Sequence, residues 1–114
     1  MYAIHEIDSL ELSAWQQDQK EFLLLDVRTA GEMAQGIIPG GVPTPLNALP
    51  EKITDLPKDK LVVLYCRTGA RSAQATAYMT AMGFNNTYNL RGGIMDWLRQ
   101  GLGVSTPDPG FFQD

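Results

Sequence analysis

The chain has 114 residues, a formal net charge of −4 and an apolar share of 44%. This length favours one domain with one core, and the acidic balance argues against a general nucleic-acid binder. The longest apolar run, Leu61 to Cys66, is too short to span a bilayer, and the first residues lack the basic patch and apolar segment of a secretion signal. We therefore expect a cytoplasmic protein without a membrane partner.

Short apolar runs alternate with helical stretches along the chain, which is typical of folds built from βα units. We expect an edge strand at 3–6, and then a helix from Asp8 to about Asp18, because Asp8 and Glu11 have the spacing of a capping box. The apolar run Phe22 to Leu25 favours an inner strand that is buried on both faces.

The middle of the chain is richer in turns. A short helix is expected over 30–35, and the Gly- and Pro-rich segment 36–45 predicts turns with a short strand near Val42. Leu46, Leu49 and Ile53 have helical spacing.

The second half contains the strongest predicted strand, Leu61 to Tyr65, followed by a helix over 70–82 that stops at Gly83. Three alanines recur at every fourth position of this helix, which predicts that they face the sheet: Ala73, Ala77 and Ala81. A last strand is expected at 87–90, and Ile94, Trp97 and Leu98 predict a final helix ending near Gly101. We expect one domain over 1–104 and a loosely ordered tail over 105–114.

The segment Cys66-Arg67-Thr68-Gly69-Ala70-Arg71-Ser72 joins the strongest strand to a helix. Ligands of open α/β sheets bind beyond the carboxyl ends of strands, and free N–H groups at a helix N-terminus favour an anion. Gly69 allows a positive φ, so that successive N–H groups can turn inward. Arg67 and Arg71 add positive charge, so each of these features is expected to lower the pKa of the Cys66 thiol.

A lone cysteine is more often a small buried apolar residue, but the strand end, the glycine and the two arginines favour a reactive thiol here. With Cys66 as the only cysteine and His5 as the only histidine, neither an internal disulfide nor an ordinary zinc cluster is expected. A group other than histidine is expected to activate Cys66.

The sequence resembles the rhodanese family of sulfurtransferases from Phe22 to about Gly103. The matching blocks are Asp26-Val27-Arg28, Glu32, Gly36-Ile37-Ile38-Pro39-Gly40-Gly41, Val63 to Ser72, Gly83-Phe84, Tyr88 to Ile94, and Trp97. Ile37 stands where the family often has histidine. The resemblance implies an α/β fold with a central, mostly parallel five-stranded sheet and helices on both faces.

The resemblance also implies a role for each residue of the loop. Cys66 would be the nucleophile, and the N–H groups from Arg67 through Ser72, including those of Thr68, Gly69 and Ala70, would cradle a persulfide. Arg71, with Arg67 as the second candidate, would bind the anionic donor. Asp26 and Arg28 would brace the site, and a purely structural ion pair is the favoured interpretation for them.

Related domains with one more residue between Cys and Arg act as phosphatases. Four residues separate Cys66 from Arg71, a smaller loop that suits a single sulfur atom, and no general acid is evident in it. The expected activity is that of a thiosulfate sulfurtransferase: Cys66 takes sulfane sulfur from thiosulfate or a related donor and passes it to a small thiol, cyanide or an acceptor protein, without metal or cofactor. The alternatives are a sulfur-relay protein and, ranked lower, a phosphatase or a non-enzymatic docking module.

Overall fold

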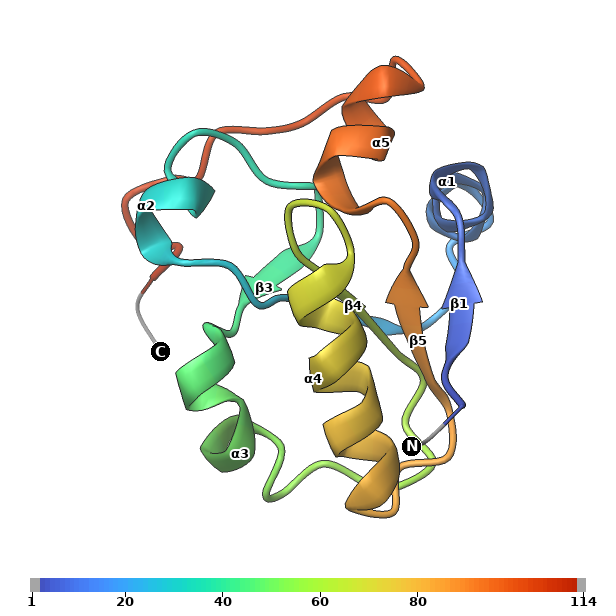
Figure 1. Cartoon of the computed structure of the whole chain (residues 1–114). Coiled ribbons are helices and arrows are strands. Elements are labelled where there is room, and N and C mark those ends of the chain that lie inside the picture. The colour runs from blue at the N-terminus through green and yellow to red at the C-terminus, as the bar shows by residue number, and fades with distance from the viewer. Residues whose placement is uncertain (1–2, 113–114) are drawn as a thin grey trace.

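A computed structural model describes residues 3–112 and contains one sheet with the strand order β1-β5-β4-β2-β3 (Figure 1). Every neighbouring pair of these strands is parallel. The strands are β1 His5–Ile7, β2 Leu23–Asp26, β3 Gly41–Pro43, β4 Val62–Tyr65 and β5 Thr87–Leu90. The predicted fold class, a parallel five-stranded sheet within an α/β fold, is confirmed.

Helices lie on both faces of the sheet. They are α1 Ser9–Gln17, α2 Ala30–Met33, the 3₁₀ turn η1 Leu46–Ala48, α3 Leu49–Lys52, α4 Ala70–Ala81 and α5 Gly93–Arg99. Side chains of α1 and α5 pack on one face of the sheet, and side chains of α3 and α4 pack on the other (Figure 1). None of the helices within residues 3–112 is long and apolar enough to cross a membrane.

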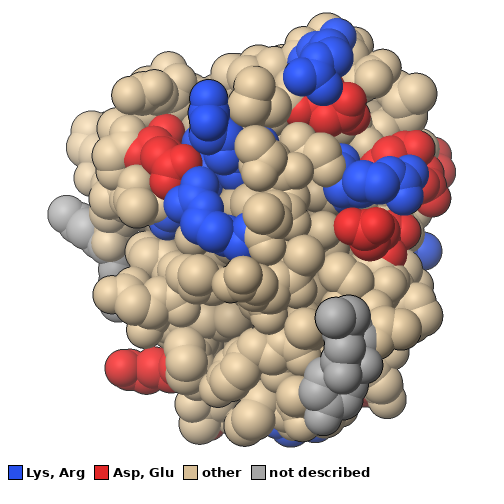
Figure 2. Space-filling view, viewed as in Figure 1, with Lys and Arg blue, Asp and Glu red and all other residues tan. Residues whose placement is uncertain are grey.

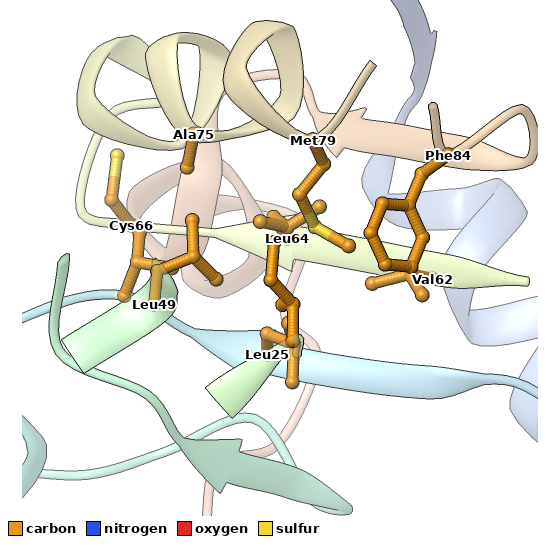
Figure 3. Close-up of a cluster of buried hydrophobic side chains, with 10 residues drawn as sticks. Leu25, Leu49, Val62, Leu64, Cys66, Ala75, Met79 and Phe84 are labelled. Carbon is orange, nitrogen blue, oxygen red and sulfur yellow. The ribbon is translucent and has the colours of Figure 1, made fainter. Parts of the chain in front are cut away.

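Strand β4 lies at the centre of the sheet and serves both cores. Because successive side chains of a strand point to opposite faces, Val63 and Tyr65 enter the core beneath α1 and α5, whereas Val62 and Leu64 enter the core beneath α3 and α4. Cys66 continues the second set and lies with Ala75 and Met79 on the α4 side (Figure 3). Burial on both faces explains the uninterrupted apolar run in the sequence.

Two helices begin with a capping box, and the first of these was predicted from the sequence. Asp8 and Glu11 form a reciprocal capping box at the start of α1. Thr29 and Glu32 form a second capping box on α2, which is shorter than expected.

The prediction for the face of α4 is wrong. The buried residues of the helix are Ser72, Ala75, Thr76 and Met79, whereas Ala81 is exposed. Burial of the two hydroxyl residues is possible because both donate hydrogen bonds: Ser72 Oγ to Asn89 Oδ1 and Thr76 Oγ1 to the carbonyl oxygen of Ser72. Polar residues thus form part of the sheet-facing stripe, and an apolar pattern could not reveal them.

In α5, Ile94 and Trp97 are buried as expected, but Leu98 is 51% exposed. The chain that follows α5 contacts the body: Trp97 Nε1 donates to the carbonyl oxygen of Gly103, and Ser105 and Ile37 exchange backbone hydrogen bonds of 2.9 Å. The domain boundary at residue 104 stays a prediction.

Candidate active site

Cys66 directly follows β4, and the loop after it leads into α4. Gly69 is the N-cap of α4 and has a φ of +101°. A Cβ atom on Gly69 would lie 3.2 Å from the backbone nitrogen of Gly92 and 3.4 Å from the carbonyl oxygen of Leu90. Both the positive φ and this close approach require glycine, so the loop takes its tight shape from this residue.

The sulfur of Cys66 lies inside the turn and points toward the α4 side of the sheet (Figure 3). The side chain is buried, with 1% exposure. The backbone N–H of Gly69 donates to Sγ at 3.1 Å, the N–H of Ser72 lies 3.4 Å from Sγ, and Ser72 Oγ lies 3.4 Å from it. Donors at a helix N-terminus therefore converge on one buried sulfur atom.

Opposing effects act on the thiol. Burial alone would raise the pKa of Cys66, but hydrogen bonds from the backbone N–H groups of Ser72, Gly69 and Thr68 lower it, and the net shift is downward. The lowered pKa favours the thiolate, which is the nucleophilic form of cysteine.

Asn89 competes with the Cys66 sulfur for the proton of the Ser72 hydroxyl. Its Nδ2 donates to Glu6 Oε2 at 2.8 Å and to the carbonyl oxygen of Gly69 at 3.3 Å. Both partners are acceptors, so Asn89 Oδ1 must face Ser72, whose Oγ lies 2.5 Å away. A hydroxyl has one proton, and at these distances it points to Asn89 rather than to the sulfur. The backbone N–H groups are then the main donors to the sulfur.

The first turn of α5 forms backbone hydrogen bonds with the loop that follows β4. The N–H of Ile94 donates to the carbonyl oxygen of Cys66 at 3.0 Å, and the N–H of Met95 donates to that of Arg67 at 3.1 Å. Gly93, with a φ of +60°, lies against these two carbonyl groups, and a Cβ there would be 2.6 Å from the Cys66 oxygen. The second glycine of Gly92-Gly93 thus lets α5 approach the loop that follows Cys66.

Arg71 forms a bidentate ion pair with Glu32 of α2. Its two terminal nitrogens donate to Glu32 Oε1 and Oε2 at 2.8 Å each. The hydrogen bond from Arg71 outweighs partial burial and, with further hydrogen bonds from Thr29, lowers the pKa of Glu32 to about 2. In Figure 2, which has the orientation of Figure 1, basic and acidic side chains accordingly meet at the level of α2.

The remaining loop residues, Arg67, Thr68 and Ala70, are exposed. Arg67 borders a hollow between α2, α5 and the chain near Val104. Within residues 3–112, no acidic side chain pairs with Arg67. Arg67 is therefore the accessible cation of the loop.

Asp26 and Arg28 form a buried ion pair, with exposures of 0% and 5%. Arg28 Nη2 lies 2.7 Å from Asp26 Oδ2 and also donates to the carbonyl oxygen of Gly36 at 2.8 Å. Tyr65 donates to Asp26 Oδ2 at 2.7 Å and accepts from the N–H of Ile38 at 3.1 Å. These contacts tie β2 and β4 to the segment before β3. None of them reaches the sulfur.

The interpretation of the sequence assigned no individual role to Glu32, Tyr65 or Asn89, although all three belong to the quoted family blocks. A local signal existed for Glu32, because Thr29 and Glu32 have capping-box spacing. Glu6, which holds the Asn89 amide, had no local signal, because it lies 83 residues away in sequence.

The parallel sheet between two layers of helices superposes on solved rhodanese-like proteins. The family model for the rhodanese-like domain matches residues 9–100. The chain belongs to this family.

Similar proteins support the assignment. The chain is 46% identical over 105 residues to a sulfurtransferase of Allochromatium vinosum, covering 92% of this chain and 98% of that protein. It is 39% identical over 94 residues to the putative sulfurtransferase YtwF of Bacillus subtilis, covering 82% of this chain and 90% of that one. A crystal structure of a thiosulfate sulfurtransferase from Pseudomonas aeruginosa superposes with a TM-score of 0.83 at 25% identity, over 90% of this chain and 20% of that chain.

Proposed function

We propose that this protein is a sulfurtransferase that carries sulfane sulfur as a persulfide on Cys66, taking it from thiosulfate or a related donor and giving it to a thiophilic acceptor. The observation that carries the proposal is the convergence of the Gly69 and Ser72 N–H groups on the buried Cys66 sulfur. Similarity to sulfurtransferases, one of which matches over almost its whole length, supports the same activity.

The proposed reaction has two steps. The Cys66 thiolate attacks the outer sulfur of the donor, the bond between the donor's two sulfurs breaks, and sulfite leaves when the donor is thiosulfate. An acceptor nucleophile then attacks the outer sulfur of the persulfide, and the thiolate is restored. The inward N–H groups stabilise the negative charge at the sulfur in both steps. Sulfur moves between nucleophiles, so the cycle needs no external oxidant or reductant.

Intact-mass spectrometry tests the proposal directly. Cys66 is the only cysteine, so a gain of one sulfur on exposure to thiosulfate or glutathione persulfide reports on this residue. We expect a sulfur adduct on the wild type and none on Cys66→Ala, with loss of turnover in the variant. Retained turnover by Cys66→Ala would contradict the proposal, and failure of Cys66 to gain sulfur from any donor would favour a docking module.

The length of the loop is the second basis for sulfur chemistry. Only four residues separate Cys66 from Arg71, and this tight turn places the Gly69 and Ser72 N–H groups 3.1 and 3.4 Å from one atom. Insertion of a glycine between Ala70 and Arg71 is expected to widen the turn and weaken sulfur transfer. Undiminished transfer by this variant would refute the argument from loop size and return a phosphatase to consideration.

A sulfur-relay role is the second candidate, and the hollow beside Arg67 favours it. Three apolar side chains at this hollow are exposed, Met95 by 37%, Leu98 by 51% and Val104 by 40%, as expected where a protein surface is contacted. Mass spectrometry of candidate acceptor proteins mixed with persulfide-loaded protein tests this role. Fast thiosulfate turnover without transfer to any protein would count against it.

A further inference from the structure

The ion pair between Arg71 and Glu32 changes the charge that a sulfur donor meets. Both terminal nitrogens of Arg71 are occupied by the two carboxylate oxygens of Glu32. The pair carries no net charge, and the donors that would best match an incoming anion are already used. The side chains are 37% and 28% exposed, so the pair is accessible to solvent, and Glu32 lines the same hollow as Arg67.

Glu32 is held firmly in this position. Its backbone N–H and one carboxylate oxygen form a capping box with Thr29. Its carbonyl oxygen lies 3.4 Å from Nη1 of Arg28, whose other nitrogens bind buried Asp26. With its pKa lowered to about 2, the carboxylate stays negative at every pH at which the protein would work. It therefore presents a fixed negative charge beside the loop.

We propose that Glu32 is a specificity-determining residue that makes the Cys66 site prefer an organic persulfide over thiosulfate as sulfur donor. The inference rests on the proposed sulfurtransferase function and narrows its substrate class. Thiosulfate brings two negative charges, whereas the reacting group of an organic persulfide brings at most one. The carboxylate of Glu32 repels the more highly charged donor and withholds Arg71 from it, which leaves Arg67 as the cation available to either donor.

The chemical step is balanced for the preferred donor. The Cys66 thiolate attacks the outer sulfur of R–S–S–H, the bond between the two donor sulfurs breaks, and R–S⁻ leaves. The outer sulfur keeps its proton and is now bonded to Cys66 Sγ. One sulfur–sulfur bond replaces another, and the negative charge of the thiolate passes to the leaving thiol, so no redox partner is required.

The experiment compares kcat/KM for thiosulfate and for glutathione persulfide, with one acceptor, in the wild type and in Glu32→Gln. Glutamine retains the size of the side chain and an oxygen for the Thr29 N–H, but it removes the charge and frees Arg71. We expect kcat/KM for thiosulfate to rise about tenfold at low ionic strength, with a smaller rise at high salt, because exposed charges are screened. The value for glutathione persulfide should change less than about twofold, since its reacting persulfide group carries at most one negative charge and its two carboxylates lie several bonds away from the reacting sulfur.

Glu11→Gln is the matched control. Glu11 occupies the same capping-box position on α1 that Glu32 occupies on α2, but it makes no ion pair with Arg71. It should leave the ratio of the two kcat/KM values unchanged. The double variant Glu32→Gln with Arg71→Gln should lose the gain for thiosulfate, because the freed guanidinium is absent.

The wild type provides a test without substitution: its kcat/KM should be higher for glutathione persulfide than for thiosulfate. A preference for thiosulfate in the wild type, or an equal change for both donors in Glu32→Gln, would overturn the inference and leave the proposed function intact. A wild-type Cys66 that gains sulfur from neither donor would instead refute the proposed function itself.

Discussion

Two polar clusters lie near the carboxyl end of β4, on opposite sides of the sheet, and they differ in what they leave available. On the α1 and α5 side, Asp26, Arg28 and Tyr65 bind one another and nearby backbone groups, and all three are almost fully buried. On the α4 side, N–H groups surround the Cys66 sulfur, an atom that can gain or lose a substituent. In the first cluster the charged groups pair with each other, whereas in the second the N–H groups point to the sulfur that we propose reacts.

A positively charged side chain near the proposed site is therefore not necessarily free to bind a substrate. Arg28 is committed to Asp26, and Arg71 is committed to Glu32. Backbone N–H groups, which have fixed positions and do not titrate, supply the positive partial charge at the sulfur in place of positive side chains. Stability and reactivity are therefore expected to respond to different substitutions.

The largest expected effect on stability comes from removing one partner of the buried ion pair. Asp26→Ala leaves Arg28 charged in an environment with 5% exposure. We expect a loss of about 3–5 kcal/mol in the free energy of unfolding, measured by denaturant titration, because breaking a buried pair leaves an uncompensated charge. Tyr65→Phe removes only a hydroxyl and should cost about 1–3 kcal/mol.

Tyr65→Phe also tests whether the two clusters act independently, because the Tyr65 side chain points away from the sulfur. The rate at which the folded variant reacts with iodoacetamide at Cys66 should equal that of the wild type. A slowed reaction in this variant, at matched pH and with the fold intact, would show that the two clusters are coupled.

An effect smaller than that of Asp26→Ala is expected from Gly93→Ala, which places a Cβ in the contact between α5 and the loop. A Cβ at this position would lie 2.6 Å from the carbonyl oxygen of Cys66, and the φ of +60° is unfavourable for alanine. We expect a loss of about 2–4 kcal/mol in stability together with slower sulfur uptake by Cys66, because strain and overpacking add.

Gly101→Ala is the control for backbone conformation alone. Its φ of +79° is also positive, but a Cβ there would have no neighbour within 4 Å. The expected loss is about 1–2 kcal/mol with unchanged sulfur uptake. Equal losses in stability and activity for the two variants would mean that the contact with the loop contributes nothing.

The sequence predicted the strands, the capping box of α1 and the loop around Cys66, because each of these leaves a local pattern in the chain. The sequence did not predict that Arg71 pairs with Glu32, because the two residues lie 39 positions apart. The ion pair forms only when α2 packs against the loop. The face of α4 was assigned wrongly because buried Ser72 and Thr76 are polar, and their partners become visible only in three dimensions. Local patterns thus predict the elements, whereas packing decides which side chains remain available.

The smallest expected effect concerns the proton of the Ser72 hydroxyl. Asn89 Oδ1 lies 2.5 Å from Ser72 Oγ, and the sulfur of Cys66 lies 3.4 Å from it. Asn89→Leu removes the competing acceptor, so the hydroxyl can turn and donate to the thiolate. We expect the pKa of Cys66 to fall further, because a hydrogen bond from the hydroxyl stabilises the charged thiolate more than the neutral thiol.

The measurement is the rate of Cys66 alkylation as a function of pH, which decreases as pH falls through the pKa of the thiol. In Asn89→Leu, reactivity should persist to lower pH than in the wild type. Ser72→Ala should leave the midpoint nearly unchanged, since the wild-type hydroxyl donates to Asn89 and not to the sulfur. A midpoint raised in Ser72→Ala would show that the hydroxyl already stabilises the thiolate, and the backbone N–H groups would then share this role with a side chain.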